Sequence, residues 1–92
     1  MFDKKSIPVR SPDIIGKMTE SEAILVMPQK GQVKVINEVG AVIWELIDGK
    51  RTIEKIIEEI VFQFDVDPMT AEVDVINFTT ELYKRDIIDL LS

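Results

Sequence analysis

The 92-residue chain contains neither cysteine nor histidine. Without cysteine it can form no disulfide, no thiolate metal site and no cysteine nucleophile. Without histidine it also lacks imidazole ligands and the side chain that most often acts as a general base near neutral pH. We therefore expect a protein without a metal, without a cofactor and without catalysis of the common kinds.

Long hydrophobic runs are missing as well. Even the longer apolar runs, such as Ala23–Met27, are short, whereas about 20 residues are needed to span a membrane. The first residues, Met1–Lys5, have neither the apolar core nor the cleavage site of a signal peptide. Hydrophobic residues make up 46% and charged residues 30% of the chain, which is typical of a folded globular protein. We expect one cytoplasmic domain over residues 1–92 and no membrane contact.

The net charge of −6 is unevenly distributed. Residues 1–36 carry six Lys and Arg against four Asp and Glu, whereas residues 37–92 carry five against thirteen. A nucleic-acid-binding domain needs clustered basic side chains that displace counterions from phosphates. The acidic second part of the chain therefore argues against a nucleic-acid partner.

Before Asn37 the pattern is typical of short strands. Glu22–Met27 and Gln32–Ile36 are apolar segments separated by a turn, so they predict an antiparallel hairpin. Ser6–Val9 is expected to be extended because a residue before proline avoids helical geometry. Asp13–Met18 is a candidate third strand or bend. The sequence thus predicts three short strands and at least one open sheet edge.

After Asn37 the apolar residues recur with helical spacing. Asn37, Thr52 and Asp67 are favoured N-cap residues and predict three helix starts. Asp48-Gly49 is expected to end the first helix, with Trp44 in the core or at its rim. Further predictions are an inner stripe on the third helix, formed by Ala71, Val75, Phe78 and Leu82, and an apolar tail, Ile87–Leu91, that packs back onto the domain. The predicted fold class is α+β, a winged-helix-like domain with a three-stranded antiparallel sheet followed by three helices.

Apolar residues outside the predicted core suggest a binding surface. Ile76, Thr79 and Tyr83 are expected on one flank of the third helix, and Val33, Val35 and Ile36 give a strand whose two faces are both partly apolar. One explanation is that the helices cover both sets of side chains. The other is a groove between an open strand edge and the third helix, which suits an extended peptide that adds a strand to the sheet.

At this point the sequence resembles a known family. The segments Ile36-Asn37-Glu38, Ile43–Gly49 and Arg51–Ile56 are similar to the PqqD family pattern of Leu-Asn, Ile-Trp-x-Leu-hydrophobic-Asp-Gly and Arg-Thr-hydrophobic-x-x-Ile. The resemblance covers roughly residues 8–91. One departure is Asp86, where the family commonly has glycine, and aspartate tolerates left-handed geometry better than most residues.

The resemblance implies a module that binds the leader of a ribosomally made precursor peptide and presents the precursor to a modifying enzyme, often a radical S-adenosylmethionine enzyme. In the family the leader adds as a strand in the groove against the third helix. The resemblance then implies a peptide-binding set of Val33, Lys34 and Val35 on the strand and Ile76, Thr79, Thr80 and Tyr83 on the helix. It fixes neither the precursor nor the pathway.

Two other readings remain open from the sequence. A winged-helix transcription regulator has the same order of elements, although Glu72, Asp74 and Glu81 precede the basic pair Lys84-Arg85 on its expected reading helix. A structural or dimerisation subunit, including a homodimer, is the second, because open strand edges and apolar flanks also support self-association.

Overall fold

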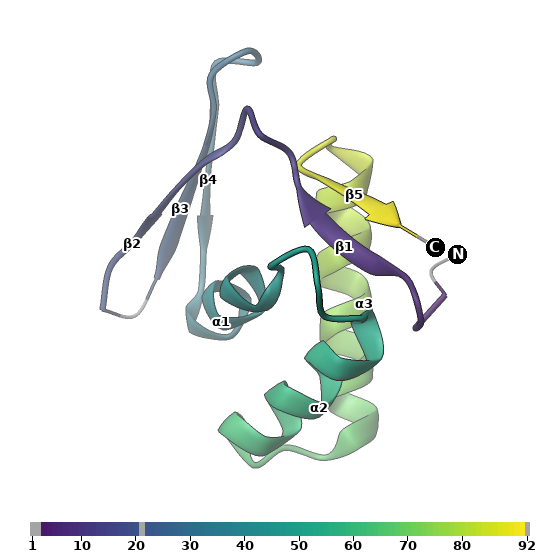
Figure 1. Cartoon of the computed structure of the whole chain (residues 1–92). Helices are drawn as coiled ribbons and strands as arrows, with labels where there is room; N and C mark the ends of the chain where they lie inside the picture. The colour runs from purple at the N-terminus through teal and green to yellow at the C-terminus, as the bar shows by residue number, and fades with distance from the viewer. Residues whose placement is uncertain (1–2, 21, 92) are drawn as a thin grey trace.

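The chain forms a mixed α+β fold in the computed structural model, which describes residues 3–20 and 22–91. Three helices stand beside a sheet of β2, β3 and β4, and a second small sheet of β1 and β5 lies against the helices (Figure 1). The elements are β1 Ile7–Arg10, β2 Ile15–Met18, β3 Ala23–Met27, β4 Gln32–Ile36, α1 Glu38–Leu46, α2 Ile53–Phe64, α3 Pro68–Lys84 and β5 Ile88–Leu91. The predicted fold class is confirmed.

The three-stranded sheet has the order β2-β3-β4, with both pairings antiparallel. The predicted hairpin is present, with Met27 opposite Gln32 and Ala23 opposite Ile36. Alternate residues of β3, namely Ala23, Leu25 and Met27, are buried against the helices, as expected for a sheet with one covered face. Because β4 stands last in this order, it is an edge strand with one edge that pairs with no other strand of the described residues.

The prediction of three strands in total is wrong, because the described residues form five. Ser6–Val9 was expected only as an extended stretch and Ile87–Leu91 only as an apolar tail. Instead, β1 and β5 pair antiparallel, with Ile7 opposite Leu91 and Arg10 opposite Ile88. Pairing between strands so distant in sequence leaves no local pattern, since a turn signal marks only neighbouring strands.

The helix starts are confirmed at the predicted caps. The side chain of Asn37 accepts a hydrogen bond from the Gly40 amide at 2.9 Å, and that of Thr52 accepts one from the Lys55 amide at 3.1 Å. Asp67 accepts from the amides of Met69 and Thr70, with Pro68 in the first turn of α3. These bonds satisfy amide groups that a helix leaves unpaired at its N-terminus.

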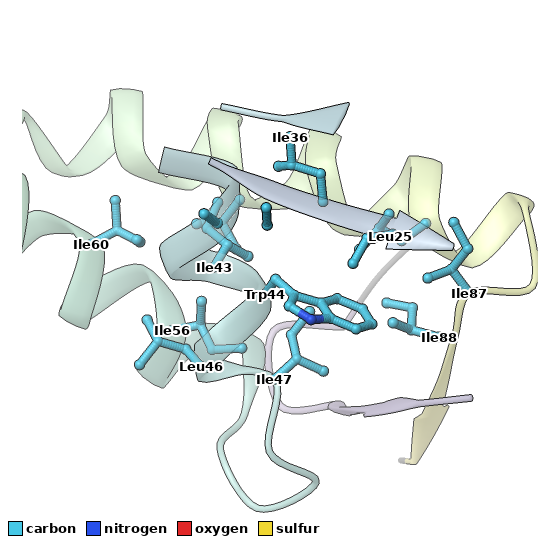
Figure 2. Packing of buried hydrophobic residues seen from close by; sticks show 14 of the residues in the cluster. Leu25, Ile36, Ile43, Trp44, Leu46, Ile47, Ile56, Ile60, Ile87 and Ile88 are labelled. Carbon is cyan, nitrogen blue, oxygen red and sulfur yellow. The ribbon is translucent and has the colours of Figure 1, made fainter. Parts of the chain in front are cut away.

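Trp44 lies in the core, as predicted, with 3% of its surface exposed. Figure 2 shows its indole ring among the side chains of Leu25, Ile47 and Ile88. Gly16 of β2 makes this packing feasible, because a Cβ at Gly16 would come within 2.7 Å of Trp44 Nε1. The guanidinium of Arg10 lies 4.5 Å from the ring centroid and donates to the Trp44 carbonyl. Trp44 therefore joins both sheets to α1.

Candidate functional site

β4 offers an unpaired edge next to α3. Among the described residues, β3 is the one strand that pairs with it. Val33 and Val35 point to the outer face of the sheet, opposite Val26 and Ile24, and are 62% and 61% exposed. Lys34 lies on the inner face, opposite the buried Leu25. An edge strand of this kind carries amide and carbonyl groups that an added strand can pair with.

Two lysine contacts place α3 along this edge. Lys34 Nζ lies 3.1 Å from Glu81 Oε1, and Lys30 Nζ donates to the Arg85 carbonyl at 2.9 Å. The two figures agree that β4 is the strand of its sheet on the side of α3. Lys30 precedes Lys34 in the chain, whereas its partner Arg85 follows Glu81. β4 and α3 therefore run in opposite directions.

A hollow lies at the other end of β4, where Asn37 follows the strand. It has a volume of about 250 Å³ and is lined by Asn37, Val39, Gly40, Ile43, Asp74, Asn77 and Phe78. Gly40 allows the close approach of the two helices, since a Cβ there would lie 3.0 Å from Phe78 Cε1. We call the space bounded by β4, by this hollow and by Asp74, Asn77, Phe78 and Glu81 of α3 the β4–α3 groove.

The groove is apolar at its base and charged at its margins. Val39, Ile43 and Phe78 contribute apolar surface to the hollow, and Asp74 places a carboxylate beside it. At the turn end, the hydrogen bond and charge of Lys34, with a smaller contribution from Arg85, hold the pKa of Glu81 below its usual value. A ligand in this groove therefore meets hydrophobic surface between charges of both signs.

The structure brings together only part of the predicted peptide-binding set. Val33, Lys34 and Val35 lie on the edge strand as expected. Ile76, Thr80 and Tyr83, however, lie on the flank of α3 away from the groove, because residues two positions apart differ by about 200° around a helix. Thr79 is fully buried, with its hydroxyl bonded to the Val75 carbonyl at 2.7 Å.

The groove flank consists instead of Asp74, Asn77, Phe78 and Glu81, which repeat at i, i+3, i+4 and i+7. Phe78 was expected in the inner stripe, but Thr79 takes the buried position and Phe78 is only partly buried. The spacing of these residues is visible in the sequence. Which flank faces β4 is not, because that depends on how α3 packs against the rest of the fold.

The described residues provide no metal site. They contain no group of three or more acidic side chains placed to hold a metal ion. None of the described helices is long and apolar enough to cross a membrane.

Comparison with protein families decides what kind of protein this is. The family described as coenzyme PQQ synthesis protein D (PqqD) matches residues 22–88. The chain belongs to the PqqD family. The match includes β3, β4, all three helices and the start of β5, so it covers every element that forms the groove.

Individual relatives agree with this assignment. A PqqA binding protein of Pseudomonas syringae pv. syringae (strain B728a) is 41% identical over 70 residues, which cover 76% of this chain and 72% of the relative. A PqqA binding protein of Xanthomonas oryzae pv. oryzae (strain KACC10331 / KXO85) is 29% identical over 72 residues, covering 78% and 76%.

Two solved structures share the fold of this PqqD family member. TbiB1 in complex with the TbiA(beta) leader peptide superposes with a TM-score of 0.80 at 25% identity, covering 88% of this chain and 94% of TbiB1. Lasso peptide synthetase B1 complexed with the leader peptide gives 0.79 at 17% identity, covering 90% and 98%. At 17% identity the second likeness concerns the fold alone.

Proposed function

We propose that this protein binds the leader segment of a ribosomally made precursor peptide, which adds as a strand to β4 in the β4–α3 groove. The open β4 edge beside a partly apolar hollow is the observation that carries the proposal. Backbone groups of β4 would hold a strand of almost any sequence, and the hollow would select an apolar side chain from it. The names of the PqqA binding relatives and the TbiB1 leader complex support the same function.

The proposed contact set follows the structure. Val33, Lys34 and Val35 supply the edge, and Phe78 and Asp74 supply the hollow. Inward side chains of the peptide would contact the hollow and Lys34, because alternate residues of a strand point to opposite faces. Outward side chains would lie beside Val33 and Val35, extending the apolar outer face of the sheet. Ile76, Thr79, Thr80 and Tyr83 are left out of this set.

The proposal makes the protein a binding partner rather than an enzyme. A chain without cysteine or histidine lacks the common nucleophile and base. The chemistry on the bound precursor then belongs to a separate enzyme, for which a radical S-adenosylmethionine enzyme is the expectation. The proposal places the complex in the cytoplasm, because the precursor is made on ribosomes.

Titration calorimetry with synthetic PqqA from Pseudomonas syringae and with the TbiA(beta) leader tests this function. We expect one of the two peptides to bind with a Kd of about 1 μM or lower, equivalent to about −8 kcal/mol. Hydrogen exchange at the β4 amides should slow on binding, whereas the α2 amides should not change. If neither peptide binds and β4 exchange is unaffected, strand addition is the wrong function.

A pair of matched variants locates the added strand. Val35→Asp should weaken peptide binding by up to about fivefold, since a cross-strand pair contributes about 0.2–1 kcal/mol. Ile15→Asp, on β2 at the opposite edge of the same sheet and 50% exposed, should leave the affinity unchanged. Equal effects of the two variants would contradict binding at β4.

A further inference from the structure

The register of the sheet identifies which backbone groups of β4 are open. The Thr19 amide donates to the Glu22 carbonyl at 2.8 Å, so these residues form a hydrogen-bonded pair at the end of β2 and β3. Bonded and unbonded pairs alternate along antiparallel strands. Ile24 therefore directs its backbone groups to β2, and Leu25 directs its own to its partner Lys34 on β4.

The same alternation continues along β4. Because Lys34 bonds β3, its neighbours Val33 and Val35 direct their amide and carbonyl groups to the free edge. An antiparallel peptide strand that uses these four groups places one residue opposite Lys34 and another opposite Ile36. Such unbonded pairs bring side chains closer together than bonded pairs do. The peptide side chains at these two positions therefore decide how well a strand fits.

The position opposite Ile36 suits an apolar side chain. A Cβ at Gly40 would overlap Ile36 Cγ2, and Gly40 lines the hollow. A peptide residue opposite Ile36 therefore directs its side chain toward the hollow. The hollow, at about 250 Å³, has room for one such side chain, since a cavity of about 150 Å³ holds benzene. In an antiparallel strand, the residue two positions later lies opposite Lys34.

Lys34 belongs to a group of side chains with one unbalanced positive charge. Its Nζ lies 3.1 Å from Glu81 Oε1, and the same oxygen lies 3.3 Å from the Arg85 guanidinium. Two cations thus share one carboxylate, whereas the neighbouring Lys30 has Asp86 at 3.8 Å. One further carboxylate would balance the group, because the ammonium of Lys34 has three donors and Arg85 keeps Glu81 paired.

The hollow end of the groove has the opposite charge. Asp74 lies beside the hollow and forms no ion pair or side-chain hydrogen bond with another described residue. A peptide carboxylate near the hollow is repelled by Asp74, whereas one near Lys34 is attracted. The charges therefore favour one order of side chains along the peptide.

We infer that Lys34 selects leaders with an acidic residue two positions after the apolar residue that enters the hollow. This inference rests on the proposed function and adds which leader side chains are recognised and in what order. The order follows from antiparallel addition, which continues the pairing of the sheet. In a parallel strand the acidic residue would come two positions before the apolar one.

The same lysine argues against a second copy of this chain as the occupant. Two β4 edges that pair through Val33 and Val35 place the two copies of Lys34 opposite each other. Like charges directly opposite on neighbouring strands are destabilising, and lysine on an edge strand is a common protection against self-pairing.

Short synthetic peptides with blocked ends test the selection. In a background of serine and threonine, the first has leucine followed two positions later by glutamate, and the second has glutamine in place of that glutamate. The third has glutamate two positions before the leucine. NMR shifts of the Val33 and Val35 amides measure binding to the full chain. The first peptide should bind about fivefold more tightly than either of the others, the upper end for an opposite-charge pair across strands, because the Lys34 side chain is only 21% exposed.

Matched variants assign the preference to one side chain. Lys34→Met removes the charge and keeps a long side chain, so the first and second peptides should bind it equally. Lys17→Met, on the outer face of β2 at the opposite edge of the sheet, should preserve the fivefold difference. Lys34→Glu should instead prefer a fourth peptide with lysine in place of the glutamate.

Several outcomes would overturn the inference. Equal binding of the first two peptides to the unmodified protein, or the same loss of preference in both methionine variants, would remove Lys34 from this role. Tighter binding of the third peptide would contradict the order. Failure of all the peptides to shift the β4 amides at about 1 mM, with PqqA or the TbiA(beta) leader still shifting them, would show that other leader features are recognised. In each of these cases binding of a natural leader at β4 keeps the proposed function, whereas its absence contradicts both.

Discussion

Gly40 decides how closely α1 approaches α3, and so how the hollow is formed. A Cβ at this position would overlap Ile36 Cγ2 and come within 3.0 Å of Phe78 Cε1. Both neighbours belong to packed elements, so neither can move away without disturbing β4 or α3. The residue is conformationally ordinary for a helix, and its small size is the property that matters.

Gly40→Ala is therefore expected to destabilise the protein. Helix propensity favours alanine by about 1 kcal/mol, but overpacking costs about 1–3 kcal/mol, so the overlap should dominate. Urea unfolding followed by circular dichroism measures the difference. Glu45→Ala, on the exposed side of α1, is the control for an alanine substitution in the same helix without the overlap. A more stable Gly40→Ala variant would contradict the tight contact.

Asp48 makes the stability of the fold depend on pH in the acidic range. Its carboxylate accepts hydrogen bonds from the Arg51 and Lys50 amides, and these bonds hold its pKa below the usual value. A carboxyl with a lowered pKa in the folded state stabilises the fold above its unfolded pKa of about 4. That contribution is lost as the pH falls through the lower, folded value.

Asp48→Asn should thus lower the Tm at pH 7 and have little effect below the pKa of the folded carboxyl. Thermal unfolding at pH 7 and at successively lower pH values would show a smaller acid-induced decrease in the variant than in the unmodified protein. Asp89→Asn serves as control, because Asp89 forms no ion pair or side-chain hydrogen bond with another described residue. An identical pH dependence in all three proteins would remove Asp48 from this role.

At the scale of elements, the features predicted from sequence are those that depend on neighbouring residues. The caps Asn37, Thr52 and Asp67 were predictable because each bonds amides two or three residues ahead. The rotation of α3 was not, because the helical repeat gives angles between side chains without saying which side faces β4. Thr79 illustrates the limit, since a polar side chain is buried here after bonding its own helix.

The two flanks of α3 should respond differently to truncation. Phe78→Ala removes apolar surface from the hollow. It should weaken the binding of PqqA by about 1–3 kcal/mol, the usual range for an anchor contact. Tyr83→Ala, on the flank away from the groove, should leave that affinity unchanged. Calorimetry measures both, and circular dichroism confirms that each variant is folded. A larger loss of affinity for Tyr83→Ala would indicate that the leader binds the flank of Ile76 and Tyr83, as the sequence predicted.

At the scale of the whole molecule, the distribution of charge argues against a nucleic-acid partner. The acidic excess lies in residues 37–92, which form the three helices and β5. Gel shifts at about 150 mM salt should therefore show no binding tighter than the non-specific range of roughly 10⁻⁴ M. A sharp, sequence-dependent shift would favour the transcription regulator that the sequence left open.

The pairing of β1 with β5 has a consequence for biosynthesis. Ile7 is synthesised well before its partner Leu91, which lies 84 residues later in the chain. At about 5–20 residues per second, β1 waits several seconds before its partner strand exists. The hairpin of β3 and β4 forms from adjacent residues and faces no such delay. Vectorial synthesis thus orders the assembly, with the β3–β4 hairpin formed before β1 can pair with β5.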